Sequence, residues 1–287
     1  MSYQTIIFEK KENYVVITLN RPDKLNALNK QMFDDLDDAF QKIELDRDVH
    51  GLILTGSGEK AFAAGADIKE LHESDDRSGK LFSEYGSKVM KRLAELRIPT
   101  IAAINGFALG GGCELTLACQ MRFASENAKM GQPEVNLGII PGYGGTQRLT
   151  RIVGKAKAME LILSANMLNA EQAEKIGLVN AVYKPEELLP KTEEFMKLIL
   201  TKGPLAVSAA VECINAAEEL SPLEGLAFES RKFGEVCGTA DFKEGPKGCP
   251  KNLKNSLNCS FIWPVSLFST TTLTDTTVGI TALLTFT

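Results

Sequence analysis

Three consecutive glycines, Gly110 to Gly112, most constrain what this 287-residue chain can fold into. They follow an apolar strand, Thr100 to Ile104, and precede an apolar run with helical spacing that begins at Cys113. Glycine loses more backbone freedom on folding than other residues, so three in a row mark a turn with unusual dihedrals or a close approach to the backbone. The sequence therefore predicts a strand, a tight glycine turn and a helix.

The start of that helix is a predicted site for negative charge. Amides in the first turn of a helix have no internal partner and carry the positive end of the helix dipole. Glu114 follows Gly111 by three residues, so its carboxylate would stand beside whatever those amides hold. Two simpler interpretations stay open: the carboxylate only complements the dipole of its own helix, and the glycines only form a turn.

Composition excludes several classes of function. Apolar residues make up 44% of the chain and charged residues 24%, as expected for a globular protein with one large core. A net charge of -5 without a basic stripe argues against nucleic acid as a partner. The six cysteines form no C-x-x-C pair and there are two histidines, so we expect no metal site.

The same features predict a location. Unpaired cysteine spacing fits a reducing, cytoplasmic compartment, and the first residues have no signal-peptide character. The apolar-leaning stretch 261–287 contains Pro264 and Asp275 and would make a poor membrane span. We therefore expect a cytoplasmic protein with no membrane partner.

Hydrophobic periodicity predicts strands alternating with helices, followed by a mainly helical region from Arg151 to Val236. The predicted strands are 3–8, 14–19, 51–55, 100–104, 121–127, 128–132 and 178–182, and the predicted helices are 30–45 and 71–97. Four aspartates of the helix 30–45 (Asp34, Asp35, Asp37 and Asp38) are interpreted as a solvated face. The small-residue run 61–67 favours a second close backbone approach, with a helix beginning near Asp67 that places the Ala66 amide at its start.

Six stretches, in this order, carry a resemblance to a known family: 20–29, 61–70, 104–115, 131–135, 137–149 and 173–179. With them, the chain from about Ile6 to Lys243 resembles the crotonase (enoyl-CoA hydratase/isomerase) superfamily and is most similar to its short-chain enoyl-CoA hydratases. The resemblance implies an α/β fold, the crotonase (ClpP-like) spiral of ββα units, with a helical C-terminal region that forms trimers, often paired into hexamers. The expected domains are a spiral core over 1–195, the helical region 196–245 and an atypical tail, 246–287.

The resemblance also implies site residues. The two amides of an oxyanion hole fall on Ala66 and Gly111, and the two catalytic carboxylates fall on Glu114 and Glu134. Coenzyme A contacts are expected at Lys24, Leu25, Ala27, Ala64, Asp67 and Ile68. The acyl chain is expected to contact Phe107, Leu109, Pro141 and Tyr143. No separate cofactor is implied, because coenzyme A is part of the acyl-CoA substrate.

Two carboxyls and two amides suit hydration of a 2-enoyl thioester. Water adds to C3, charge moves onto the thioester oxygen, and fixed amides stabilise that charge. Two close carboxyls do not both ionise easily, so we expect Glu114 to act as the base on water and Glu134 to protonate C2. The alternatives are a Δ3,Δ2-enoyl-CoA isomerase, which commonly needs only the position of Glu134, and a non-catalytic acyl-CoA- or RNA-binding relative.

The chain departs from the family pattern near its end. Pro246 begins a segment that cannot continue a helix, and Asp275 is the only charged residue from Asn255 onward. We interpret 246–287 as a disordered tail or one encoded out of frame. Because the family's last helix helps to hold the adenine end of coenzyme A, weaker coenzyme A binding or poorer assembly is expected.

Overall fold

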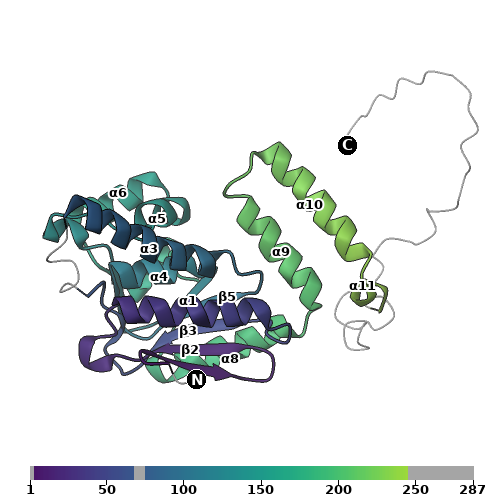
Figure 1. Ribbon diagram of the computed structural model, residues 1–287, viewed down its shortest axis with the longest axis horizontal. Coiled ribbons are helices and arrows are strands. Elements are labelled where there is room, and N and C mark those ends of the chain that lie inside the picture. The colour runs from purple at the N-terminus through teal and green to yellow at the C-terminus, as the bar shows by residue number, and fades with distance from the viewer. Residues whose placement is uncertain (1–2, 68–74, 245–287) are drawn as a thin grey trace, which may run out of the picture. The chain divides into compact units, whose positions relative to one another are not determined.

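The computed structural model describes residues 3–67 and 75–244 (Figure 1). The described residues up to Lys243 belong to one compact unit. Three expectations fall outside the described residues: the tail 246–287, the contact residue Ile68, and the course of a helix that begins near Asp67.

A six-stranded sheet forms the centre of this unit, in the order β1-β2-β3-β5-β7-β10. Its strands are β1 (Ile6–Lys10), β2 (Val15–Leu19), β3 (Leu52–Gly56), β5 (Thr100–Ile104), β7 (Met121–Ser125) and β10 (Ala181–Tyr183). Only β1 runs antiparallel to its neighbour, β2; every other pair in this sheet is parallel. Parallel neighbours need long crossover connections, and helices supply them here.

The helices begin and end as follows: α1 (Lys30–Leu45), α3 (Asp76–Ala94), α4 (Gly111–Ala118), α5 (Gly145–Val153), α6 (Lys155–Ser164), α7 (Ala170–Lys175) and α8 (Pro185–Leu200). Two short 3-10 helices are η1 (Pro22–Lys24) and η2 (Glu134–Leu137). The bounds predicted for α1 are confirmed, because the Asn29 side chain caps its first turn by accepting from the Met32 amide.

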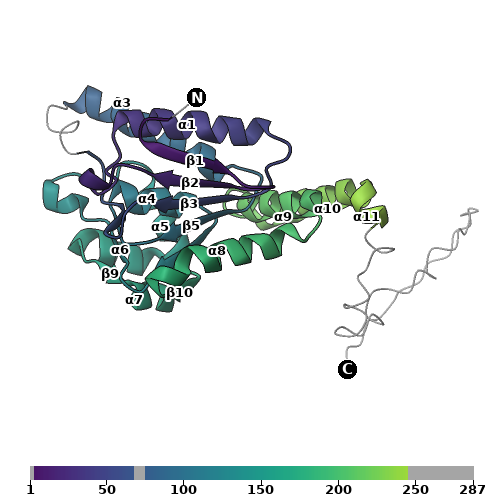
Figure 2. The ribbon, with the colours of Figure 1, turned by 90° about the horizontal axis from the view of Figure 1, so that it is seen from below.

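Side chains alternate between the two faces of the sheet, so they pack into two separate cores. In β2, Val15, Ile17 and Leu19 face a large core shared with α1, whereas Val16 faces a smaller core shared with α8. Figure 2 shows α1 and α8 on opposite sides of the strands. A parallel sheet covered on both faces explains why its strands read as continuous apolar runs.

A second sheet of four strands has the order β4-β6-β8-β9. Its strands are β4 (Ala61–Ala63), β6 (Phe107–Leu109), β8 (Lys129–Gly131) and β9 (Leu168–Asn169). Each of β3, β5 and β7 is followed in the chain by one strand of this second sheet. The repeat of strand, strand and helix is the predicted spiral of ββα units, and the predicted fold class is confirmed.

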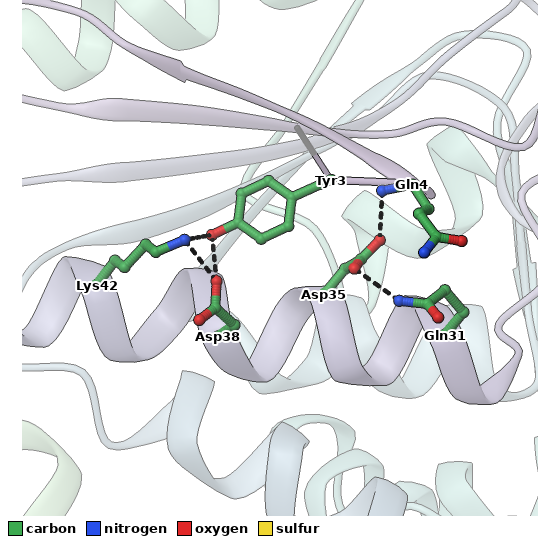
Figure 3. Close-up of polar contacts among 6 residues, drawn as sticks. All are labelled: Tyr3, Gln4, Gln31, Asp35, Asp38 and Lys42. Atoms are coloured by element: carbon green, nitrogen blue, oxygen red, sulfur yellow. Dashed lines mark hydrogen bonds and ion pairs between the residues drawn. The ribbon is translucent and has the colours of Figure 1, made fainter. Parts of the chain in front are cut away.

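Asp35 of α1 is buried and does not belong to a solvated face, which corrects for that residue the interpretation made from the sequence. Asp35 is 6% exposed and accepts from the backbone amides of Gln4 (3.0 Å) and Thr5 (2.8 Å). Asp38 accepts from Tyr3 and Lys42 (Figure 3). These contacts fasten the segment before β1 to α1.

The helical C-terminal region contains α9 (Pro204–Ala216), α10 (Pro222–Cys237) and α11 (Ala240–Glu244). Helices α9 and α10 pack on each other, yet no residue of either is buried. Their large exposed apolar side chains are Leu205, Ile214, Leu223, Leu226 and Phe233. Among the described helices, none alone has the length and apolar character of a membrane span; α8 and α9 together do, with a bend of 107° between them.

Candidate active site

The glycine turn brings two backbone segments together at the start of α4. A Cβ atom at Gly112 would lie 1.9 Å from the carbonyl oxygen of Ala63, at the end of β4. Gly110 precedes the helix with a φ of 51°, a conformation that favours glycine. The run is therefore required by the close approach of β4 as well as by the turn itself.

The amides of Ala66 and Gly111 lie close together. A Cβ atom at Gly111 would be 3.5 Å from the nitrogen of Ala66. Leu28 bonds to the residues on either side of Ala66, donating to the Gly65 carbonyl and accepting from the Asp67 amide, both at 2.8 Å. Because successive peptide groups of an extended chain point to opposite sides, the Ala66 N–H is directed away from Leu28.

Gly111 is the first residue of α4, and the first bond within that helix runs from the Glu114 amide to the Gly110 carbonyl, at 2.9 Å. The Gly111 N–H therefore lies before the first hydrogen bond of the helix and has no acceptor within it. Both amides belong to residues that line one cavity, so the pair can receive an anionic oxygen there.

The Glu114 carboxylate is buried and held by backbone amides. It is 1% exposed, and its Oε1 accepts from the amides of Tyr143 and Gly145, each at 2.7 Å. Gly145 is the first residue of α5, so the carboxylate lies at the positive end of that helix. Burial raises the pKa of Glu114, while the Gly145 and Tyr143 amides and the charge of Arg148 oppose that rise.

Glu134 is the second carboxyl of the site, placed by the rigid Pro133 at the start of η2. It is 8% exposed, and burial, with a smaller contribution from the charge of Glu114, raises its pKa to about 7. Gln132, which is fully buried, has an amide orientation in which its nitrogen donates to Glu134 Oε1 (3.0 Å) and Oε2 (3.2 Å). One carboxyl of the site is thus ready to hold a proton near neutral pH.

A cavity of about 700 Å³ joins these groups. Ala66, Gly111, Glu114 and Glu134 all line it. Of the predicted substrate contacts, Ala64, Leu109, Pro141 and Tyr143 also line it. The structure therefore brings together all four predicted catalytic residues and four of the predicted substrate contacts.

The other described substrate contacts lie outside the cavity lining. Lys24, Leu25 and Ala27 belong to a loop whose Leu25 carbonyl accepts from the Ala64 amide at 3.0 Å. Asp67 is joined to that loop by an ion pair with Arg21, at 3.2 Å. Phe107, expected beside the acyl chain, pairs with Ala61 and Lys129 in the second sheet and does not line the cavity.

Sequence reasoning missed three parts of the site. Gln132 and Arg148 were not singled out, although Gln132 contacts Glu134 and Arg148 Nη1 donates to the Tyr143 carbonyl at 2.8 Å. The role of the Gly145 amide was also missed. Adjacent glycines before a helix, 144–145, were the available signal, as they were at 110–112. In the described part of the chain, no cluster of three or more His, Cys, Asp or Glu is placed to hold a metal.

Comparison with known proteins identifies the family. Residues 9–254 match the family model described as enoyl-CoA hydratase/isomerase, which extends the resemblance beyond Lys243. A short-chain-enoyl-CoA hydratase of Clostridium acetobutylicum is 47% identical over 244 residues, covering 85% of this chain and 94% of the relative. A crotonyl-CoA hydratase of Syntrophomonas wolfei is 45% identical over 245 residues, covering the same shares of each chain.

A solved structure supports the same relationship. The crystal structure of an enoyl-CoA hydratase from Bacillus anthracis superimposes with a TM-score of 0.84 at 37% sequence identity, covering 87% of this chain and 97% of that one. Fold and sequence agree over most of the chain. The chain therefore belongs to the enoyl-CoA hydratase/isomerase family.

Proposed function

We propose that this protein is an enoyl-CoA hydratase that adds water reversibly across the 2,3 double bond of a short-chain trans-2-enoyl-CoA. One observation carries the proposal: two carboxyls and two backbone amides line a single cavity. The relatives named as short-chain-enoyl-CoA and crotonyl-CoA hydratases support this choice of substrate.

The amides of Ala66 and Gly111 are assigned to the thioester oxygen. When water adds to C3, the double-bond electrons move through C2 and place negative charge on that oxygen. Fixed donors stabilise this charge more than the neutral thioester, so they lower the barrier. Removing one comparable donor elsewhere costs about 3 kcal/mol, so the pair is a large part of catalysis.

The carboxyls divide the proton transfers. Glu114, whose Oε1 accepts from the amides of Tyr143 and Gly145, takes a proton from the attacking water as its oxygen bonds to C3. Glu134, whose pKa of about 7 leaves about half of it protonated at neutral pH and more below it, gives its proton to C2. Hydration leaves Glu114 protonated and Glu134 ionised, so a proton must pass from Glu114 to Glu134, directly or through solvent water, before the next turnover. The two carboxyls therefore titrate as a coupled pair.

The coenzyme A part of the substrate is assigned to the loop that contains Lys24, Leu25 and Ala27, together with Ala64 and Asp67. Hydrogen bonds of the buried Asn26 side chain fix the shape of this loop, because the side chain accepts from the Arg21 amide (2.9 Å) and donates to the carbonyl of Ala61 (2.9 Å). A preformed loop loses little entropy on binding. The acyl chain is assigned to the cavity beside Leu109, Pro141 and Tyr143.

Assembly into a homotrimer or hexamer is proposed through α9 and α10. Phe233 is 71% exposed and Leu223 is 78% exposed on helices that bury nothing in one chain. Exposed apolar faces of this kind are typical of protein interfaces. We further propose a reducing, cytoplasmic location, in keeping with free thiols at the four described cysteines.

Crotonyl-CoA hydration by Glu114→Gln and Glu134→Gln tests the proposal. Each variant is expected to lose at least a hundredfold in kcat while remaining folded, since each removes one proton-transfer step. Glu126→Gln is the matched control, because Glu126 is exposed at the end of β7. Normal turnover by either folded site variant would refute the mechanism.

A second substrate, a 3-enoyl-CoA, distinguishes the hydratase from the isomerase alternative. If the wild-type protein isomerises a 3-enoyl-CoA but does not hydrate crotonyl-CoA, the Δ3,Δ2-isomerase function replaces the hydratase. If neither substrate reacts, the protein is a non-catalytic acyl-CoA binder or performs other chemistry.

A further inference from the structure

The peptide group between Gly142 and Tyr143 is hydrogen-bonded at both ends. Its carbonyl oxygen accepts from the hydroxyls of Ser83 (2.5 Å) and Ser87 (3.2 Å), which both belong to α3. Its N–H donates to Oε1 of Glu114 at 2.7 Å. One peptide group therefore connects α3 to the carboxylate assigned to water activation.

The sequence of α3 is suited to this contact. Ser83 and Ser87 are four residues apart, so they lie on one face of the helix. Gly86 lies between them and against the Tyr143 ring; a Cβ atom at Gly86 would be 2.4 Å from its Cε1 atom. A larger residue there would push α3 away from the Gly142 carbonyl, so the glycine allows both hydroxyls to reach it.

Helix α3 also forms part of the cavity wall. Gly79, Phe82 and Ser83 line the cavity, and the Phe82 and Tyr143 ring centroids lie 5.7 Å apart. An acyl chain in the cavity would therefore contact the same helix that donates to the Gly142 carbonyl. Displacement of α3 by a chain of the wrong size would alter the peptide that holds Glu114.

Hydrogen bonding polarises this peptide group. Two hydroxyls that donate to its carbonyl make its N–H a stronger donor, because hydrogen bonds in a chain reinforce one another. The acceptor at the other end is a carboxylate, and bonds to charged acceptors are the stronger ones. Loss of the hydroxyls would weaken the support of the Glu114 anion and free the loop to move.

We propose that Ser83 and Ser87 are positioning residues for Glu114, which they orient through the Gly142–Tyr143 peptide and so couple to the acyl-binding wall. This inference rests on the proposed hydratase function. The serines do not exchange protons with the substrate; they act on the group that does.

The test compares Ser83→Ala/Ser87→Ala with the wild type. We expect kcat for crotonyl-CoA to fall about tenfold, the lower end for loss of a group that orients a catalytic one, with KM changed by less than about threefold. The acidic limb of the pH profile should move to higher pH, because the Glu114 anion has lost support. Ser87→Thr, which keeps the hydroxyl, should retain more activity than Ser87→Ala.

A readout that is independent of turnover completes the design. In protein labelled with ¹³C at the glutamate side-chain carboxyl carbon, the Glu114 signal, assigned with Glu114→Gln, should titrate at a higher pH in the double variant. Ser164→Ala is the control, since its hydroxyl donates to the Glu160 carbonyl, away from the cavity. An unchanged titration midpoint in the folded double variant would overturn the inference, as would lost activity with an unmoved acidic limb. An inactive wild type would instead overturn the proposed function alone.

Discussion

Replacing Glu134 with glutamine is expected to make the protein more stable above neutral pH, although it removes a group that we assign to catalysis. Burial raises the pKa of this carboxyl from 4.5 to about 7. Ionising it in the folded state is therefore costly, whereas in the unfolded chain it ionises freely. Glutamine is close in shape and never ionises, so it escapes that cost.

The pH window and the magnitude follow from those two values. Below pH 4.5 the carboxyl is protonated in both states, and wild type and variant differ little. Between pH 4.5 and about 7 the folded state keeps a proton that the unfolded state has lost, so the wild type loses stability relative to the variant as pH rises. Above that window the difference in unfolding free energy between wild type and variant is constant at about 3 kcal/mol, because each pKa unit corresponds to about 1.4 kcal/mol.

Urea unfolding at several pH values measures this difference. The wild type, Glu134→Gln and the surface control Glu126→Gln should be compared at one protomer concentration, because assembly also contributes to stability. The control should follow the wild type at every pH. A difference between wild type and Glu134→Gln that does not grow with pH, or a variant less stable than wild type above pH 8, would refute the reasoning.

Three further predictions concern the same features. The rate of crotonyl-CoA hydration should fall on the alkaline side of pH 7, as Glu134 loses the proton that it gives to C2. Gln132→Leu removes the hydrogen-bond donors to the Glu134 carboxylate, so it should raise the pKa of Glu134 and move this alkaline limb of the pH profile to higher pH. Gly112→Ala should lower the free energy of unfolding by about 3 kcal/mol or prevent folding, because its Cβ would overlap the Ala63 carbonyl. Gly225→Ala in α10 is the matched control, because a Cβ there has no atom within 4 Å, and it should raise the free energy of unfolding by up to about 1 kcal/mol. Urea unfolding measures both. Phe233→Asp should reduce the oligomer to smaller species in size-exclusion chromatography while crotonyl-CoA turnover per chain falls less than in Glu134→Gln; an unchanged elution volume would place the interface elsewhere.

The framework of the fold could be predicted because its signals are local. Apolar runs such as 100–104 and the stripe along α1 specify their own elements, and Asn29 marks where α1 begins. The burial of Asp35 in α1 could not be predicted locally. Asp35 binds amides some thirty residues earlier in the chain, and only the pairing of the N-terminal segment with α1 creates that contact.

The family resemblance implied four residues that the structure places around one cavity, but the groups that contact them could not be predicted. Gln132 is two residues from Glu134, a spacing that does not indicate a contact without knowledge of the turn between them. Ser83 and Ser87 resemble any polar pair on an amphipathic helix until α3 is placed against the loop at Gly142. Phe107, which the resemblance placed beside the acyl chain, lies in the second sheet and is not among the residues that line the cavity.

The position of Glu114 decides against the simpler interpretation of this residue that the sequence left open. A glutamate in the first turn of a helix can complement the dipole of its own helix. Here the side chain instead reaches the start of α5, where Gly145 and Tyr143 donate to it. The first-turn amides of α4 are thereby left available to a ligand, while the Gly145 amide of α5 holds the carboxylate that we propose as the base. This arrangement needs a glycine turn before each helix, so the second turn at 144–145 is as much a part of the candidate site as the first.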